Sequence, residues 1–139
     1  MKGKPIILLL ILAAVALAAF AMESALGKRA EQRRHDSYDA LLREYSTVLR
    51  PDARRREVEA FLTSRGRSFQ QMCCLLNENR NALEDIVKVG SEPKPWYCRE
   101  NDMYLVFEFD SMPDPQFPKA HPDDRLRRIA LSPWLGGCL

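Results

Sequence analysis

Residues 6–22 read IILLLILAAVALAAFAM and contain no charged or polar side chain. Lys2 and Lys4 precede this run, and its second half is rich in alanine. A basic start followed by an apolar run is typical of an export signal, and the small residues Ala19 and Ala21 suit a signal-peptidase cleavage site. The run therefore predicts that the rest of the chain leaves the cytoplasm, as a periplasmic or secreted protein.

The same run also suits an uncleaved membrane anchor. At about 1.5 Å of rise per residue, a helix of this length spans about 25 Å, close to the lower limit for a hydrocarbon core of about 30 Å. Basic residues lie on both sides of the run, so the charge distribution does not decide the orientation of the chain. We favour cleavage after Ala21; retention of the run instead gives a protein anchored by a single N-terminal helix.

Composition divides the chain into three parts. Residues 1–22 are the signal peptide or membrane anchor, residues 23–36 a polar linker without apolar periodicity, and residues 37–139 one domain with a modest core. Without Lys2 and Lys4 the 21 basic residues fall to 19, which equals the 19 acidic residues. A net charge of zero counts against nucleic-acid binding.

Two amphipathic helices are predicted at the start of the domain. Apolar residues recur at spacings of three, four and seven from Tyr38 to Leu49, and Pro51 ends this helix. Asp52 is expected to cap a second helix, and Gly66 is a natural stop for it. The apolar residues of the second helix are Val58, Phe61 and Leu62.

After Gly66 the apolar period changes to two, which is typical of strands. The clearest strand covers residues 103–110, and the last strand, residues 126–131, is expected to lie antiparallel to it. Other strand segments are predicted at residues 69–76, 83–89 and 96–99. Helices followed by strands predict an α+β fold: an N-terminal signal or anchor helix, two amphipathic helices and a four-stranded antiparallel sheet with one face covered by helix.

Several short motifs carry a resemblance to known proteins. The segments RRREVEAFL (54–62), FEFD (107–110) and LRRIAL (126–131) follow one another in a layout that resembles outer-membrane assembly lipoproteins of the SmpA/OmlA type. The segments VKVGSEPKPWYC (87–98), YLVFEFD (104–110) and GGCL (136–139) are similar to small exported bacterial domains without an assigned function. Neither resemblance implies a catalytic residue, and the first implies a role in the bacterial envelope.

The four cysteines predict a disulfide framework in an oxidising compartment. They are Cys73, Cys74, Cys98 and Cys138, with no CxxC pair and only two histidines in the chain, a poor basis for a zinc site. A bond between the neighbours Cys73 and Cys74 is strained, which leaves two pairings. We expect at least one bridge, from Cys73 or Cys74 to Cys98, worth about 3–4 kcal/mol.

One corner of the chain is a candidate partner-binding site. Glu92, Lys94, Trp96 and Tyr97 lie between two predicted strands, next to two prolines. Exposed tryptophan and tyrosine side chains often anchor protein interfaces. The alternative is a tryptophan that fills the edge of the sheet.

Other chemical candidates are weak. The aspartates at 110, 114, 123 and 124 lack the spacing of an EF-hand, and we expect them to be solvated. Cys98 and His121 lack the flanking signature of a thiol enzyme, and a disulfide would consume the thiol. We therefore expect no metal, no cofactor and no enzymatic activity.

These observations lead to one hypothesis and two alternatives. The hypothesis is an exported, disulfide-stabilised module that binds or assembles with a protein of the envelope and touches the membrane through its N-terminal segment if that segment is retained. The first alternative is a membrane-anchored structural protein whose Arg-rich helix faces lipid. The second is a small thiol-dependent enzyme.

Overall fold

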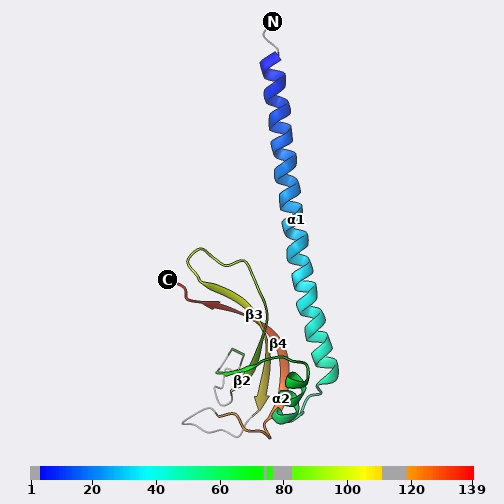
Figure 1. Cartoon of the computed structure of the whole chain (residues 1–139), viewed down its shortest axis with the longest axis vertical. Coiled ribbons are helices and arrows are strands. Elements are labelled where there is room, and N and C mark those ends of the chain that lie inside the picture. Colours follow the sequence, from blue (N-terminus) through cyan, green and yellow to red (C-terminus); the bar gives the residue numbers. More distant parts are fainter. Residues whose placement is uncertain (1–3, 74, 77–82, 111–118) are drawn as a thin grey trace. The chain divides into compact units, whose positions relative to one another are not determined.

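The computed structural model describes residues 4–73, 75–76, 83–110 and 119–139. Within them the chain has a long helix, a short helix and four strands (Figure 1). The helices are α1 (Lys4–Val48) and α2 (Arg55–Ser64), and the strands are β1 (Gln70–Met72), β2 (Glu84–Ser91), β3 (Glu100–Asp110) and β4 (Arg125–Gly136). The chain forms two compact units, Met1–Asp39 and Ala40–Leu139.

α1 is one continuous helix where the sequence pattern predicted three separate elements. Its 45 residues include the apolar run, the predicted polar linker at 23–36 and the predicted helix from Tyr38 onward. The segment 23–36 stays helical because it consists mainly of glutamate, glutamine, arginine and alanine, which are strong helix formers. Two separate amphipathic helices are therefore not found; one long helix and one short helix precede the sheet.

α2 begins two residues later than a cap at Asp52 would require. Arg54 is the N-cap residue, and the Glu57 carboxylate accepts a hydrogen bond from its backbone N–H at 3.0 Å. Asp52 instead has a positive φ of 67° and donates its backbone N–H to the carbonyl of Leu126. Gly66, also with a φ of 67°, follows the end of α2, as predicted.

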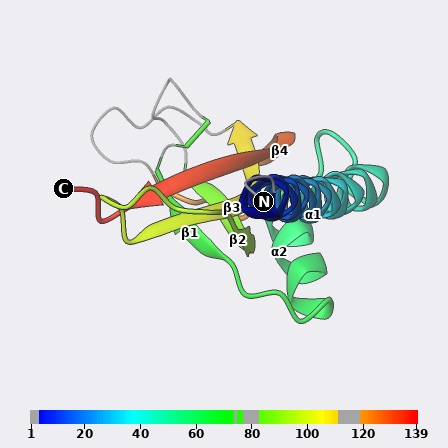
Figure 2. The same ribbon diagram turned by 90° about the horizontal axis from the view of Figure 1, so that it is seen from above.

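The sheet has four strands in the order β1-β2-β3-β4, and every neighbouring pair is antiparallel, as predicted (Figure 2). β1 is shorter than expected, and residues 96–99 form a turn and bend rather than a strand. β4 is longer than expected because it pairs with β3 over the full length of that strand, from Asp110 opposite Arg125 to Glu100 opposite Gly136. Trp134 therefore lies within β4, beyond the predicted end of the last strand at residue 131.

The core of the second unit lies between one face of the sheet and the two helices. Tyr45 of α1 packs edge-on against Phe61 of α2, with ring centroids 5.6 Å apart, and contacts Phe107 of β3. Val58 and Leu62 of α2 are fully buried in the same cluster. The remaining buried members are Leu49, just after α1, and five strand residues, Val87, Leu105, Phe107, Phe109 and Leu126.

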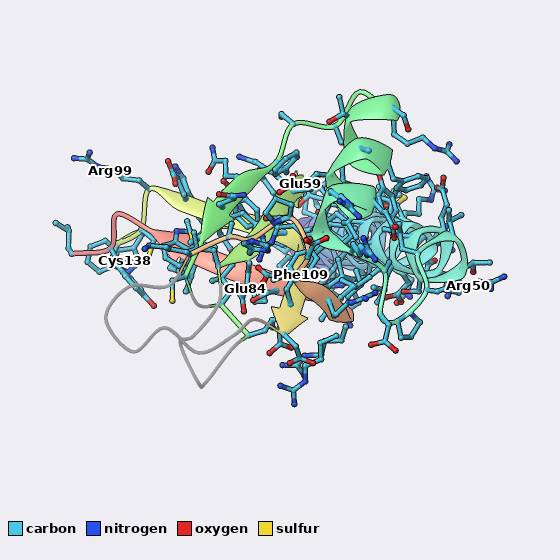
Figure 3. All side chains as sticks on the ribbon, turned by 90° about the horizontal axis from the view of Figure 1, so that it is seen from below. Arg50, Glu59, Glu84, Arg99, Phe109 and Cys138 are labelled. Carbon is cyan, nitrogen blue, oxygen red and sulfur yellow. A yellow bond between two sulfur atoms is a disulfide. The ribbon has the colours of Figure 1, made fainter. Side chains whose placement is uncertain are left out.

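On the other face of the sheet, side-chain hydrogen bonds hold Leu75 and Leu76. Glu84, labelled in Figure 3, is buried, and its carboxylate accepts hydrogen bonds from the backbone N–H groups of Leu75 and Leu76. Arg128 donates to the Leu76 carbonyl and pairs with the Glu108 carboxylate. These bonds hold Leu75 and Leu76 beside the buried Glu84 and Glu108 carboxylates, so both faces of the sheet contain buried residues.

Candidate functional site

The β2–β3 connection and the end of β4 form a surface that we call the aromatic tip, defined by Trp96, Tyr97, Trp134 and Leu135. Trp96 is 91% exposed, and its ring meets Tyr97 edge-on with centroids 5.8 Å apart. Trp134 and Leu135 lie opposite Asp102 and Asn101 at the start of β3, so they sit at the same end of the sheet. The tip thus presents large apolar side chains to solvent.

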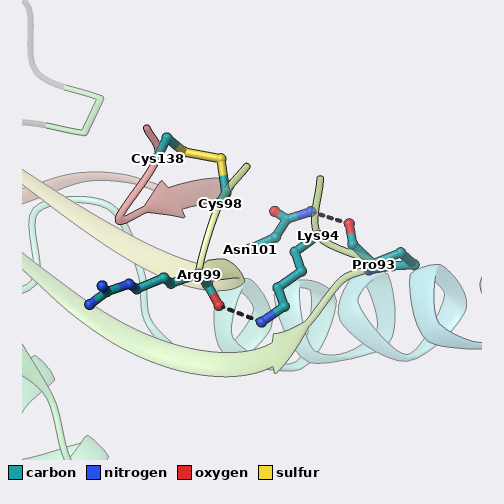
Figure 4. Close-up of a disulfide and its surroundings, with 6 residues drawn as sticks. All are labelled: Pro93, Lys94, Cys98, Arg99, Asn101 and Cys138. Carbon is teal, nitrogen blue, oxygen red and sulfur yellow. Dashed lines mark hydrogen bonds between the residues drawn. A yellow bond between two sulfur atoms is a disulfide. The ribbon is translucent and has the colours of Figure 1, made fainter. Parts of the chain in front are cut away.

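A disulfide and main-chain hydrogen bonds hold the aromatic tip in place. Cys98 is buried and bonded to Cys138, which joins the loop to the segment after β4 (Figure 4). The Arg99 N–H donates to the Gly136 carbonyl at 3.1 Å, and the Leu139 N–H donates to the Tyr97 carbonyl at 3.0 Å. These contacts extend the β3–β4 pairing beyond the two strands and limit the motion of the loop.

Gly137 allows this close pairing. Its φ is +60°, and a Cβ atom at this position would lie 3.1 Å from the Arg99 side chain. A larger residue would therefore be strained and would push against the loop that carries Trp96.

The base of the loop is fixed by polar side chains. Asp102 accepts hydrogen bonds from the Lys88 ammonium at 2.6 Å and from the Ser91 hydroxyl at 2.7 Å. These two donors lower the pKa of Asp102 and keep it ionised, whereas the same contact raises the pKa of Lys88. The Asn101 side-chain amide donates to the Pro93 carbonyl at 2.8 Å, which closes the loop from the other side (Figure 4).

The four residues predicted for partner binding have different surroundings. Trp96 and Tyr97 are exposed, so Trp96 does not fill the edge of the sheet. The Lys94 ammonium donates to the Arg99 carbonyl at 2.9 Å and so helps to close the loop (Figure 4). Glu92 is half-buried, and its backbone N–H donates to the Asn101 carbonyl. Their part in partner binding stays a prediction.

The expected disulfide pairing is wrong. Cys98 is bonded to Cys138 and not to Cys73 or Cys74, because the end of β4 runs beside the start of β3 and brings the two sulfur atoms together. Cys73 is also disulfide-bonded, and Cys74 lies outside the described residues. None of the described cysteines is a free thiol, so Cys98 cannot act as a nucleophile with His121.

A buried ion cluster, which the sequence pattern did not predict, connects α2 with two strands. The Arg55 guanidinium pairs with the Asp85 carboxylate at the start of β2 and with the Asp124 carboxylate before β4. It also donates to the Leu83 carbonyl and stacks on Phe109, with its central carbon 3.9 Å from the ring centroid. All three charged side chains are buried.

The spacing of residues along α2 could have predicted that Arg55 is buried. Arg55 precedes Val58 by three residues and Leu62 by seven, so it lies on the buried face of α2, whereas Arg54 and Arg56 do not. Burial raises the pKa of Asp85 to about 7 even though Arg55 stands beside it, and nearby Glu59 and Asp124 act in the same direction as burial.

The suggested cation site does not assemble among the residues that the structure describes. No group of three or more histidine, cysteine, aspartate or glutamate residues there could hold a metal ion. Asp124 pairs with Arg55, and Asp123 pairs with the exposed Arg54 and Arg56 at 3.5 Å. Asp114 lies outside the described residues, and Asp110 is 3.8 Å from Arg127.

α1 is long and apolar enough, by length and composition, to cross a membrane. Its apolar side chains from Leu8 to Met22 are exposed, and the helix continues through Ala19 and Ala21, the predicted cleavage site, without a break. The segment is therefore compatible with a signal sequence or with an anchor.

Comparison of the chain with known protein families, with curated proteins and with solved structures finds no match. What the protein does has therefore to be inferred from its own residues and their geometry.

Proposed function

We propose that this chain is a non-enzymatic module that binds a protein partner through the aromatic tip in an oxidising compartment. The observation that carries the proposal is Trp96, which is 91% exposed on a loop that a disulfide and several hydrogen bonds hold still. A loop whose backbone is already held by a disulfide and hydrogen bonds loses less conformational entropy when a partner covers it. Tryptophan and tyrosine are also the residues most enriched in the energetic centres of interfaces.

Two features support a location outside the cytoplasm. Disulfides persist in oxidising compartments, and Cys98 and Cys138 form one. The exposed apolar side chains of residues 8–22 are unfavourable in water, so this part of α1 must be removed or embedded in a membrane. Export of the folded unit explains both features.

We further propose that the apolar segment is retained as an anchor. α1 continues past Ala21 to Val48 without a helix break, and its last residues contribute Tyr45 to the core of the folded unit. Lys28 and Arg29 follow the apolar run within about 10 Å along the helix, which suits contact with anionic lipid headgroups. The layout that resembles outer-membrane assembly lipoproteins suggests that the partner is a protein of the envelope.

Site-specific photo-crosslinking in the producing cells tests the binding role. A photoreactive amino acid at position 96 is expected to give a discrete crosslinked product with a partner that mass spectrometry identifies. The same amino acid at Val48, which is 49% exposed and not part of the aromatic tip, is the matched control and should not give that product.

The identified partner then allows a quantitative comparison. Trp96→Ala in the purified full-length protein should weaken binding at least about 30-fold, because truncation of an interface tryptophan costs on the order of 2 kcal/mol or more. Val48→Ala should change the Kd less than about 2-fold. Equal affinity of wild type and Trp96→Ala, or the same product from both crosslinking positions, would show that the tip is not the binding site.

A further inference from the structure

The outer edge of β4 is a second surface with the geometry of a binding site. β4 forms one edge of the sheet, and β1 forms the other. β1 has only three residues, which is one way in which proteins protect a sheet edge from further pairing. β4 has twelve residues and so offers a longer template.

The chain itself already pairs with the beginning of this edge. The Asp52 N–H donates to the Leu126 carbonyl at 2.9 Å, and the Leu126 N–H donates to the Ala53 carbonyl at 2.8 Å. Arg54 and Arg125 form an isolated antiparallel bridge next to these bonds. Beyond Leu126, the described residues provide no further backbone hydrogen bond to this edge from outside the sheet. The edge therefore accepts an antiparallel partner, and the covering segment ends after a few residues.

A cavity of about 220 Å³ lies where the covering segment ends. Leu49, Pro51 and Ile129 contribute apolar walls, and Leu126 lies in the same lining. Ser46 of α1 also lines the cavity, which lies beside Arg127, Arg128 and Ile129 of β4, next to the edge where a further strand could pair. The apolar walls favour an aliphatic side chain.

The charge beside the cavity favours an acidic partner. Arg127 lines the cavity, is half exposed, and has the exposed Asp110 carboxylate 3.8 Å away, a separation at which an exposed ion pair contributes little. Arg128 lines it too but is bound to the buried Glu108 carboxylate. Arg127 is thus the cation that a carboxylate of an added strand can reach.

We propose that β4, from Arg127 to Leu131, binds an extended peptide segment of another protein by strand addition. The segment carries an aliphatic side chain for the cavity and an acidic side chain for Arg127. Backbone hydrogen bonds to the strand edge supply affinity, and the cavity and the arginine supply selectivity. Pro133 limits the site at its far end, because a proline cannot donate a backbone hydrogen bond to an added strand.

Amide hydrogen exchange of the full-length protein in detergent micelles tests this proposal. The probe is a synthetic heptapeptide that alternates valine with aspartate, and its counterpart has lysine in place of aspartate. The acidic peptide is expected to slow exchange in residues 127–131 at least about 10-fold at saturation, because the outward amides gain hydrogen bonds. The lysine peptide should have no such effect at the same concentration.

Two variants separate this surface from the aromatic tip. Arg127→Glu should weaken binding of the acidic peptide about 10-fold or more, since it reverses the charge beside the cavity. Arg99→Glu is the matched control and should leave binding within about 2-fold, because Arg99 is exposed and hydrogen-bonded to Gly136 at the far end of β4. Trp96→Ala should also leave binding of the acidic peptide unchanged. The two proposals, binding at the aromatic tip and binding at the edge of β4, can therefore be disproved separately.

Three results would overturn the proposal. The first is no protection of residues 127–131 by either peptide at millimolar concentration. The second is equal protection by the acidic and the lysine peptide. The third is protection that rises with protein concentration in the absence of peptide, which would show that a second copy of the chain covers this edge.

Discussion

At the scale of single residues, Arg55 is a buried charged side chain that joins three elements of the fold. It connects α2 to the starts of β2 and β4 through Asp85 and Asp124, and the Asp124 carboxylate also accepts the backbone N–H of His121 at 2.9 Å. One oxygen of Asp85 is buried without a hydrogen-bond partner among the described atoms. A buried charge with an unsatisfied oxygen is costly, which is why the proton on Asp85 is held so tightly.

The raised pKa of Asp85 predicts a pH dependence of stability. Between pH 3.8, the ordinary value for an aspartate, and about 7, the folded state retains a proton that the unfolded state has released. The free energy of unfolding therefore falls as the pH rises through this window, by up to about 1.4 kcal/mol per pH unit. Asp85→Asn removes this titration, so its unfolding free energy, measured by urea denaturation from pH 4 to 8, should depend less on pH than that of the wild type.

Asp123→Asn is the control for this comparison. Asp123 is close to Asp124 in sequence but half exposed, so its removal should leave the pH dependence of the wild type unchanged. A wild-type protein whose unfolding free energy instead rises steadily between pH 4 and 7 would contradict the raised pKa of Asp85.

The sequence predicted the role of a single residue correctly where that role depends on its neighbours in the chain. Gly66 as the helix stop and Val58 and Leu62 as core residues follow from backbone conformation and helical period, and they are confirmed. The pairing of Cys98 with Cys138 depends instead on the alignment of β4 with β3, which no local pattern contains. The sequence could indicate that cysteines pair, but not which ones.

At the scale of elements, the Cys98–Cys138 bond is expected to stabilise the end of the β3–β4 ribbon. It closes a loop with a sequence separation of 40 residues, for which the chain-entropy model gives about 4 kcal/mol. The double variant Cys98→Ser with Cys138→Ser should therefore lower the unfolding free energy by roughly 2–4 kcal/mol in urea denaturation. Amide exchange near Tyr97 and Arg99 should become faster, whereas exchange at Leu105 and Phe107 should stay slow.

The double serine variant is a better test than a reducing agent. Cys73 is also disulfide-bonded, so a reductant would cleave more than the bond under study. An unchanged midpoint of denaturation together with unchanged exchange at Tyr97 would show that the hydrogen bonds alone hold the aromatic tip.

Element boundaries were predicted less well than element types. The four antiparallel strands and the helix over Arg55–Ser64 follow from apolar period and turn residues. The continuity of α1 was missed because a change from apolar to polar composition was taken as a break, although glutamate, arginine and alanine continue a helix readily. The predicted last strand ended at residue 131, before Pro133, yet an edge strand tolerates proline and β4 continues to Gly136.

At the scale of the whole molecule, the chain combines one apolar helix with a folded unit that has two exposed candidate surfaces. The aromatic tip and the edge of β4 involve different parts of the sheet and different chemistry, apolar and aromatic in one case and backbone pairing beside an arginine in the other. If both surfaces bind as we propose, one small unit contacts two partners at once. Retention of the apolar helix would keep both contacts at a membrane.

The retained anchor predicts the mass and the location of the mature protein. Intact mass spectrometry of the protein from fractionated cells should give the full-length chain, and the protein should stay in the membrane fraction after carbonate extraction at high pH. Mass differences with and without reduction and alkylation should show that the cysteines are bonded, and a peptide map of the unreduced protein should contain Cys98 joined to Cys138. A mature chain that begins at Met22 and is released in soluble form would disprove the anchor and leave the aromatic tip as the surface of a secreted module. A full-length chain with every thiol free would disprove export, because a disulfide does not persist in the reducing cytosol.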